Sequence, residues 1–345
     1  MYPISWIYDL VTTVRNRLYN KKIIESISFE TSTIVVGNLS VGGTGKTPQI
    51  EYLIELLKDQ YKVAVLSRGY KRKSKGFLLA GVNSDARLLG DEPYQFYRKF
   101  PGINVAVSEN RAAGIRQLEK LKDRPDVILL DDAFQHRKVQ GGYNILLTAY
   151  QDLYVDDFIL PTGNLRENSS GAKRAQIIIV TKCPETISEE ERSLISKKLK
   201  LQNSQSLFFT SVQYGSNLLG SSNLALEKLT NTKILLVTGI ANPYPLITYL
   251  KSKQIQIEHL KFPDHYDFKG SDIFKIKARS EGLNSVILTT EKDYVRLFSR
   301  LENVFYIPIK VVFIDQKNEF ELLIKNYVDK NKKTSKNLKG EKNIY

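Results

Sequence analysis

The chain has 345 residues, of which 42% are hydrophobic and 26% are charged, a composition that excludes wholesale disorder and leaves room for two globular domains. Its net charge of +14 favours an anionic partner, whether nucleic acid, acidic lipid or a phosphorylated substrate. No run of residues approaches the roughly 18 apolar positions that a spanning helix requires. The single cysteine, Cys183, excludes an intrachain disulfide and a cysteine-based zinc site, and with three histidines we expect no histidine-rich metal centre.

Residues 1–22 are predicted to form an amphipathic helix with basic residues gathered at its far end. Asp9 interrupts the apolar region and no small-residue cleavage site follows, so we do not expect a secretory signal. This segment alone leaves two interpretations open: a helix packed on its own domain, or a helix lying in a membrane interface. The apolar stripe consists of Ile4, Ile7, Val11, Val14 and Leu18, widened by Trp6 and Leu10.

Residues 23–205 alternate between short β-branched segments and helical ones, which predicts an α/β domain built on a parallel, doubly wound sheet. In such a sheet the functional residues lie at the carboxyl ends of the strands. The expected strands are 31–40, 61–67, 104–108, 126–132, 144–149 and 176–182, and the expected helices are 50–60, 91–99 and 111–121.

A second, smaller α/β domain is predicted over residues 233–303, after a linker at 206–232. We expect residues 206–215 and 304–313 to pair as a two-stranded ribbon that connects the domains, with the return strand and a last helix within 304–328. The tail at 329–345 is rich in lysine and poor in apolar residues, which predicts disorder. The strands of the second domain are expected at 233–239, 255–262 and 285–290, and its helices at 245–252 and 271–281.

A phosphate-binding loop runs from Ser40 to Thr47 with the sequence Ser-Val-Gly-Gly-Thr-Gly-Lys-Thr, between a predicted strand and a predicted helix. Lys46 can reach the β- and γ-phosphates of a nucleotide, and the Thr47 hydroxyl can ligate Mg²⁺. Asp131 and Asp132 end an apolar strand, as metal-side acids of this fold do, and their spacing does not say which one serves the metal. The backbone N–H groups that would cradle phosphate belong to Gly42, Gly43, Thr44 and Gly45.

These motifs predict a protein that binds Mg²⁺ and a nucleoside triphosphate, and they leave three classes open. The classes are a switch GTPase, an ATPase motor or metallochaperone, and a kinase with a separate acceptor. The guanine-reading pattern Asn-Lys-x-Asp is missing, because the nearest candidate at 180–184 lacks both the Asn and the Asp. This weakens the GTPase interpretation, and no nucleic-acid-reading motif accompanies the positive charge.

Several further segments have both a structural and a functional interpretation. Asp91 can cap a helix that begins near Pro93, or it can accept a proton from an attacking hydroxyl. His265, in the other domain, can be an ordinary loop histidine, or it can pair with Asp91 when the domains close. The basic loop 67–73, which includes Arg68 and Tyr70, can bind phosphate of an acceptor or of a membrane. The remaining candidates are Gln135 and His136 after the metal-side acids, Arg166 and Glu167 in the turn 161–167, and the segment 289–293.

Taken together, the ordered motifs resemble those of the tetraacyldisaccharide 4′-kinase family, the lipid A 4′-kinases. The resemblance covers roughly residues 1–315. It implies that the γ-phosphoryl of ATP passes, with Mg²⁺, to the 4′-hydroxyl of a tetraacylated disaccharide 1-phosphate. It also favours a kinase over a regulatory P-loop switch such as a metallochaperone-type NTPase, which is the second interpretation. The motifs are VGNLSVGGTGKTP (36–48), SRGYKRKSKG (67–76), GDEP (90–93), DDAFQHR (131–137), PTGNLRE (161–167), FPDHYDF (262–268) and TTEKD (289–293).

The resemblance also implies roles for individual residues. Lys46 and Thr47 match the P-loop roles, Asp91 matches the proposed base with His265 as its partner, and Asp131 with Asp132 match the metal-side acids. It further implies a monomeric enzyme held peripherally at the cytoplasmic face of the inner membrane by residues 1–22, with a lipid-linked substrate and no nucleic acid. Residues in segments near the reacting centre are Arg68, Tyr70, Glu92, Arg111, Gln135, His136, Arg166 and Glu167.

Overall fold

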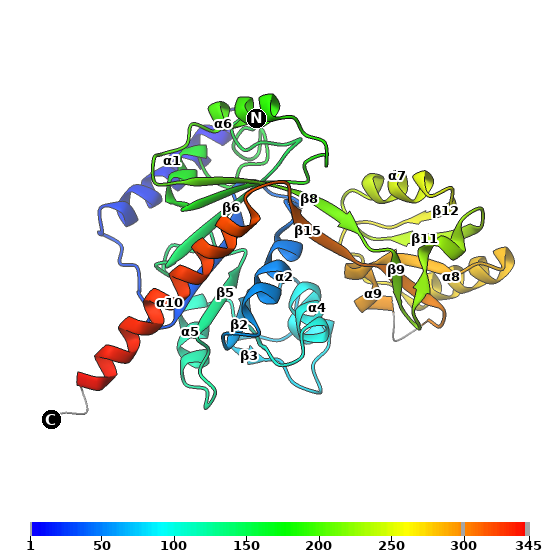
Figure 1. Cartoon of the computed structure of the whole chain (residues 1–345), viewed down its shortest axis with the longest axis horizontal. Coiled ribbons are helices and arrows are strands. Elements are labelled where there is room, and N and C mark those ends of the chain that lie inside the picture. The colour runs from blue at the N-terminus through cyan, green and yellow to red at the C-terminus, as the bar shows by residue number, and fades with distance from the viewer. Residues whose placement is uncertain (1, 298–300, 342–345) are drawn as a thin grey trace.

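The computed structural model describes residues 2–297 and 301–341, and for residues 333–341 it describes the backbone alone. Figure 1 shows two domains of unequal size, a large one near the N- and C-termini and a small one reached through strands β8 and β15. Each domain is built around its own β-sheet. The chain therefore has the predicted two-domain α/β architecture.

The large domain contains a nine-stranded sheet in the order β15-β8-β7-β6-β1-β5-β2-β4-β3. The seven strands from β8 to β4 are parallel, and antiparallel strands close both edges. Because β1 lies at the centre, the loop that follows it opens at the middle of the carboxyl edge of the sheet. The strands are β1 (Ser32–Asn38), β2 (Val63–Ser67), β3 (Leu78–Leu79), β4 (Asn104–Val107), β5 (Val127–Asp131), β6 (Tyr143–Ala149), β7 (Ile177–Thr181), β8 (Ser206–Tyr214) and β15 (Ile309–Phe313).

Helices cover both faces of this sheet, and each face has its own hydrophobic core. Alternate residues of β1 show the division, because Ile34 and Val36 pack on one face and Val35 packs on the other. One face is covered by α2 (Lys46–Leu57), α4 (Asp91–Lys99) and α10 (Lys317–Glu341), and the other by α5 (Arg111–Glu119) and α6 (Glu189–Leu199). Two short helical segments, α3 (Ala86–Leu89) and the 3₁₀ turn η1 (Ser169–Arg174), complete the domain.

The small domain has a six-stranded sheet in the order β10-β9-β14-β13-β11-β12, with parallel pairing from β14 to β12. Helix α7 (Tyr244–Ser252) packs on one face, and helix α8 (Gly270–Leu283) packs on the other. A further helix, α9 (Glu291–Leu297), follows β13 and contacts α4 of the large domain. The other elements are β9 (Asn217–Gly220), β10 (Leu224–Ala225), η2 (Leu226–Leu229), β11 (Lys233–Thr238), β12 (Gln256–Lys261), β13 (Ile287–Thr290) and β14 (Val304–Ile307).

The two domains are connected by the predicted antiparallel ribbon, formed by β8 and β15. Residues 206–209 of β8 pair with β7, whereas residues 210–214 pair with β15, so one strand leaves the large sheet and continues toward the small domain. Residues 304–313 form two strands instead of one, because Pro308 separates β14 of the small sheet from β15 of the ribbon. Residues 217–225 belong to the small sheet instead of a linker.

The C-terminal helix α10 is longer than the sequence indicates. It continues to Glu341, whereas the sequence leads to an expected helix end at 328 and a disordered tail at 329–345. The apolar face formed by Phe320, Ile324 and Val328 packs into the core and nucleates the helix, and the lysine-rich residues that follow favour helix propagation. Residues 342–345 of that predicted tail lie outside the described part of the chain.

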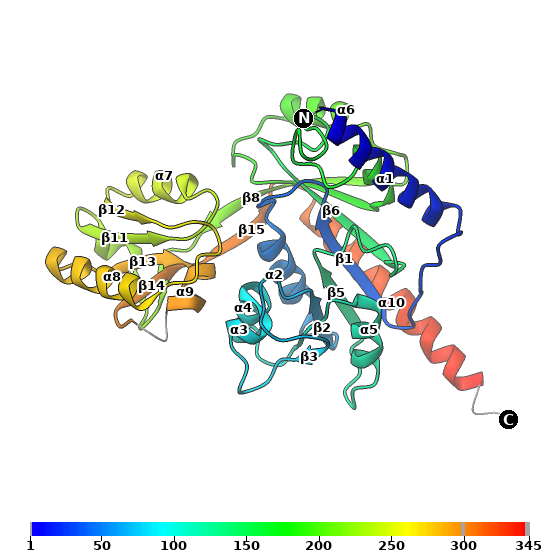
Figure 2. The ribbon, with the colours of Figure 1, turned by 180° about the vertical axis from the view of Figure 1, so that it is seen from behind.

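Helix α1 (Tyr2–Asn20) lies along the large domain (Figure 2). The exposure of its side chains shows that its polar side faces the protein. Ser5 and Thr12 are buried, whereas Ile4, Ile7 and Val11 are 61–65% exposed. The apolar stripe therefore faces outward, which contradicts the interpretation that it packs on its own domain. Among the described residues, no helix combines the length and hydropathy needed to cross a membrane.

Replacing Phe320 with alanine should destabilise the large domain by about 3–5 kcal/mol, because the ring is fully buried and its loss leaves a cavity. The ring centroid lies 4.6 Å from that of Phe313 and 5.4 Å from that of Phe208. Urea unfolding followed by circular dichroism measures the effect. Leu322→Ala on the exposed side of the same helix is the control and should cost less than about 0.5 kcal/mol. Equal effects of the two substitutions would contradict the packing of α10.

Candidate active site

The phosphate-binding loop joins β1 to α2 at the centre of the large sheet. Helix α2 begins at Lys46, earlier than the predicted residue 50, so Lys46 and Thr47 lie in its first turn. Gly42 and Gly45 have backbone φ angles of 114° and 85°, which glycine adopts readily. A Cβ atom at Gly42 would meet no described atom within 4 Å, and the Thr44 hydroxyl is buried without a described partner. The loop thus has the open, donor-lined form that a nucleotide phosphate requires.

Asn38, the last residue of β1, organises the charged groups behind the loop. Its Oδ1 atom accepts a hydrogen bond from Lys46 Nζ at 2.9 Å and contacts the guanidinium of Arg166. Asp132 faces the same two cations, with its Oδ1 atom 3.6 Å from Lys46 Nζ and 2.8 Å from Arg166 Nη2. Lys46 is therefore held over the loop, where it can meet the phosphates of a nucleotide.

Asp131 and Asp132 follow one another in the chain but have different environments. Burial would raise the pKa of Asp132, but Lys46 and Arg166 outweigh it and lower this pKa to about 2. Burial and the neighbouring Asp132 carboxylate raise the pKa of Asp131 to about 6, and Ser67 donates a hydrogen bond to it at 3.0 Å. The described cations compensate the charge of Asp131 less than that of Asp132. Asp131 is therefore the better fit for a carboxylate that faces a bound metal ion.

The turn 161–167 lies against the P-loop and against α1. Val41 donates its backbone N–H to the Asn164 carbonyl at 2.7 Å, and Ser40 pairs with Leu165 in an isolated bridge. Glu167 is fully buried and receives hydrogen bonds at 2.7–3.1 Å from Asn16 of α1, Gln135 and Arg174. Gln135 also donates to the Asn38 carbonyl at 2.9 Å. The N-terminal helix is thereby linked by direct contacts to the nucleotide end of the sheet.

The other predicted substrate residues occupy different positions around this edge. Arg111 is almost fully buried and donates to the carbonyls of Ser108 and Asp131, so it ties the ends of two strands together. Burial lowers its pKa to about 10, and burial likewise lowers the pKa of His136. Arg68 is exposed, next to the P-loop edge.

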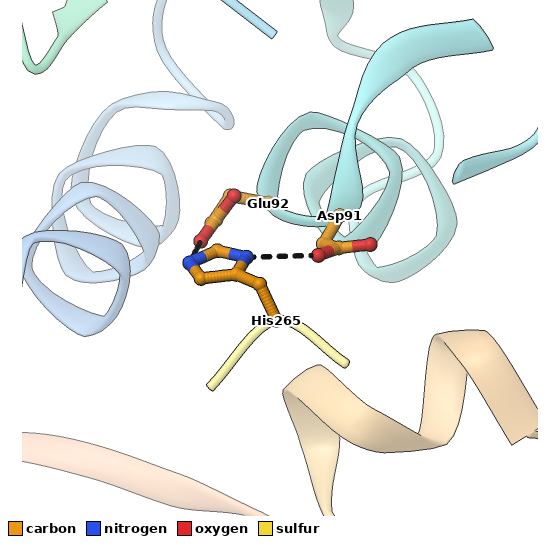
Figure 3. A group of neighbouring side chains, drawn as sticks. All are labelled: Asp91, Glu92 and His265. Carbon is orange, nitrogen blue, oxygen red and sulfur yellow. Dashed lines mark hydrogen bonds and ion pairs between the residues drawn. The ribbon is translucent and has the colours of Figure 1, made fainter. Parts of the chain in front are cut away.

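Asp91 and His265 come from different domains and meet directly (Figure 3). Asp91 begins α4 after Gly90, and His265 lies in the loop that follows β12. The His265 Nδ1 atom is 3.2 Å from the Asp91 Oδ2 atom, and the ring of Tyr70 packs edge-on against the imidazole with a centroid separation of 5.2 Å. The pair that the sequence predicts for closed domains is thus formed here.

Two cations of α9 surround this pair. Lys292 Nζ lies 2.9 Å from His265 Nε2 and 3.3 Å from Glu92 Oε1, and Arg296 contacts Asp91 through its guanidinium. Asp91, Glu92 and His265 offer ligand atoms within 4.8 Å of one another, but these cations already compensate their charge. We therefore do not interpret this group as a metal site.

A second charged contact between the domains lies beside the first. Lys99 of α4 bridges two buried carboxylates, with Nζ 2.7 Å from Glu51 Oε2 of α2 and 2.9 Å from Glu291 Oε2 of α9. Burial and the nearby Glu291 carboxylate raise the pKa of Glu51 to about 7. A cavity of about 120 Å³ lies at this junction, lined by Gln95, Arg98, Lys99, Glu291, Tyr294, Val295 and Tyr306.

Three residues of this site were not predicted individually as functional from the sequence. Asn38 stands two positions before the phosphate-binding loop, where a polar residue that ends an apolar strand is a usable signal. Lys292 stands in the segment 289–293. Arg296 follows Asp293 by three positions, so Arg296 and Asp293 lie on the same side of a helix. No pattern in the chain indicated that this helix would reach Asp91.

Comparisons with known proteins agree with this geometry. The model of the tetraacyldisaccharide-1-P 4′-kinase family matches residues 1–329. The tetraacyldisaccharide 4′-kinases of Flavobacterium johnsoniae and Bacteroides thetaiotaomicron are 51% and 48% identical, covering 96% and 97% of this chain and 97% and 94% of their own. LpxK from Aquifex aeolicus, crystallised in complex with ATP, is 32% identical with a TM-score of 0.76, covering 95% of this chain and 98% of that one.

A P-loop at the centre of a doubly wound sheet, with acidic and basic groups brought to it by a second domain, defines an ATP-dependent kinase of the P-loop NTPase fold. The motifs carry the assignment further. The chain belongs to the tetraacyldisaccharide-1-P 4′-kinase family. The resemblance inferred from the ordered motifs is thereby confirmed, and the switch and nucleic-acid interpretations lose their support.

Glu51 should make the stability of the protein depend on pH. Its pKa is higher in the folded state than the usual 4.5, so between pH 4.5 and about 7 the folded state binds more protons than the unfolded state. Stability therefore falls as pH rises through that window. Melting temperatures measured from pH 5 to 8 should show this loss in the native protein and a flatter profile in Glu51→Gln. Glu185→Gln removes an exposed carboxylate and should leave the slope unchanged; an unaltered slope in Glu51→Gln would contradict the assignment.

Proposed function

We propose that the enzyme transfers the γ-phosphoryl of ATP to the 4′-hydroxyl of tetraacyldisaccharide 1-phosphate, with Asp91 as the base. The observation that carries this proposal is the Asp91–His265 contact of 3.2 Å, which joins the two domains. The adjacent Glu92 lies close enough to Asp131 to help raise the pKa of that acid. The acceptor oxygen forms a bond to the γ-phosphorus, the bond from that phosphorus to the bridging oxygen of ADP breaks, and the hydroxyl proton passes to Asp91.

The contacts of His265 define its part in the reaction. Its Nδ1 atom lies 3.2 Å from Asp91 Oδ2, and its Nε2 atom lies 2.9 Å from Lys292 Nζ. The imidazole is thus held between the proposed base and a cation of α9. We propose that His265 orients the Asp91 carboxylate and that Tyr70 keeps the imidazole ring in place.

The remaining residues would hold the nucleotide. Lys46 would neutralise the β- and γ-phosphates, and the backbone of Gly42 to Gly45 would surround them. Mg²⁺, when bound, would be held by Thr47 and Asp131 and would compensate negative charge on the phosphate oxygens. Arg68, which is exposed, stands as a candidate for the acceptor phosphate. Arg166 is paired with Asp132 and Arg72 with Glu109, so both are less available.

The transfer reaction tests these roles directly. Labelled γ-phosphate should pass from Mg–ATP to tetraacyldisaccharide 1-phosphate in detergent micelles, and Lys46→Ala should abolish the labelled lipid. Asp91→Asn should bind ATP with normal affinity and turn over about 10²–10⁴-fold more slowly, the usual contribution of a positioned base. Near-normal turnover of Asp91→Asn would exclude its role as the base. Hydrolysis of ATP without a lipid product would instead indicate a different acceptor or a regulatory NTPase.

We also propose that the enzyme associates peripherally with the cytoplasmic face of the inner membrane through α1. An acceptor with four acyl chains resides in a bilayer, so its kinase gains from an interfacial anchor. Trp6, Ile7 and Leu10 are 64–72% exposed on the outer side of α1, which suits burial among acyl chains. The inner side contacts the site, since Tyr8 donates to the Arg166 carbonyl at 3.1 Å and Asn16 donates to Glu167 at 2.7 Å. Membrane binding would therefore bring the P-loop edge close to the lipid surface.

Point substitutions can test this association without removing the helix. Ile7→Gln combined with Val11→Gln should reduce co-flotation with anionic liposomes about tenfold or more, because two large apolar groups no longer enter the bilayer. Turnover of a soluble, short-chain acceptor should be unchanged. Phe274→Gln in α8 removes an equally exposed apolar group from the other domain and serves as the control. Unchanged liposome binding in the α1 variant would contradict the anchor.

A further inference from the structure

Arg296 connects a rigid acid of the small domain to the proposed base of the large domain. Its side chain is 8% exposed, and its Nη1 atom lies 3.0 Å from Asp293 Oδ1. Asp293 is itself fully buried and is fixed by the Gly239 N–H and the Thr290 hydroxyl, each at 2.8 Å. The other nitrogen, Nη2, contacts Asp91 Oδ2 and lies 3.2 Å from His265 Nδ1. The guanidinium is thus anchored at one end and bound to the base at the other.

This pairing is unfavourable for proton transfer. Burial would raise the pKa of Asp91, but the hydrogen bonds from His265 and Arg296 outweigh it and lower this pKa to about 2. A general base works best when its pKa lies near the operating pH, so a carboxylate held in this way accepts a proton poorly. Lys292 faces Glu92 and His265 and makes no described contact with Asp91. Arg296 is therefore the cation that keeps this base weak.

We propose that Arg296 is a positioning residue that restrains Asp91 in the substrate-free enzyme and moves onto a phosphate group of a bound substrate. This inference rests on the proposed role of Asp91 as the base. A guanidinium group can bind two oxygens of a phosphate in the same bidentate geometry with which it binds a carboxylate. A phosphate dianion also carries more negative charge than the Asp91 carboxylate. Loss of the Arg296 contact would strengthen the base only when the reactants are assembled. The phosphate would belong either to the γ-position of ATP or to the acceptor.

Substrate affinities distinguish the two phosphates. If Arg296 moves to the γ-phosphate, Arg296→Gln should weaken binding of a non-hydrolysable ATP analogue with Mg²⁺ about tenfold and leave ADP binding unchanged. If it moves to the acceptor, the KM for tetraacyldisaccharide 1-phosphate should rise by a similar factor, with both nucleotides bound normally. Either result supports the transfer of Arg296 to phosphate. Unchanged affinity for all three ligands would overturn it.

The pH profile separates this role from a merely structural one. The ratio of kcat/KM between Arg296→Gln and the native enzyme cancels the titration of the substrates. Without Arg296, Asp91 should take up its proton at a higher pH than in the native enzyme. As the pH is lowered below the pKa of Asp91 in the variant, this ratio should therefore fall about tenfold per pH unit. A ratio that stays constant from pH 8 down to the lowest pH at which both proteins remain folded would mean that Arg296 only supports the fold. The charged and titratable groups around Asp91 are Glu92, Tyr70, Asp264, His265, Lys292, Asp293 and Arg296.

Two further variants keep the inference testable if Arg296→Gln is unstable. Arg296→Lys retains the positive charge but loses the bidentate geometry of the guanidinium. Its changes in affinity and in pH dependence should therefore be smaller than those of Arg296→Gln and of the same sign. Arg279→Gln removes an exposed arginine of the same domain, which pairs with Glu258, and should match the native enzyme in every assay. Equal behaviour of Arg296→Lys, Arg279→Gln and the native enzyme would overturn the inference. Asp91→Asn with undiminished turnover would refute the base itself, independently of Arg296.

Discussion

Opposite charges that meet across the boundary between two domains are the interaction on which this enzyme depends. Asp91 and Lys99 belong to the large domain, and their partners His265, Arg296 and Glu291 belong to the small one. Lys99 also pairs with Glu51 within the large domain. Such groups are costly to bury alone and become favourable only when the partners arrive. The Asp91–His265 contact therefore forms only when the small domain docks, and the ribbon of β8 and β15 connects the two domains.

The large sheet supplies the fixed part of the site. Strand β1 lies between β5 and β6, so the P-loop, the metal-side acids and the end of β6 converge at one edge. Asn38 positions the charged groups at this edge, because its side-chain Oδ1 contacts Lys46 and Arg166 while its main-chain carbonyl accepts a hydrogen bond from Gln135. Lys46 is therefore held over the loop, and Asp132 is paired with cations. The charge of Asp131 is compensated less.

Helix α1 joins this edge to the outside of the molecule. Its polar side is satisfied by the turn 161–167 and by the loop after β5, which leaves the apolar side without protein partners among the described residues. This inverts the usual arrangement of an amphipathic helix on a globular domain. An amphiphilic acceptor could meet the helix and the catalytic edge together, because direct side-chain contacts connect them.

The amino-acid sequence by itself determined the local features of this protein. The glycine pattern of residues 42–45, the alternation of strands and helices, and the apolar spacing in α1 depend on neighbours in the chain, and the ordered motifs were sufficient to indicate the family. Sequence periodicity could reveal a stripe in α1, but it could not say which way the stripe faces, because that depends on the polar partners of Ser5 and Thr12.

Only the tertiary structure decided which charged residues that are far apart in the chain interact with one another. Arg296 lies 205 positions after Asp91, and the separate environments of Asp131 and Asp132 arise from Lys46, Arg166 and Ser67 on three other segments. Arg111 and Glu167, which the sequence presents as substrate residues, are buried in contacts within the large domain. Pairing energies of this kind depend on distance and burial, and neither can be derived from a residue's own position in the chain.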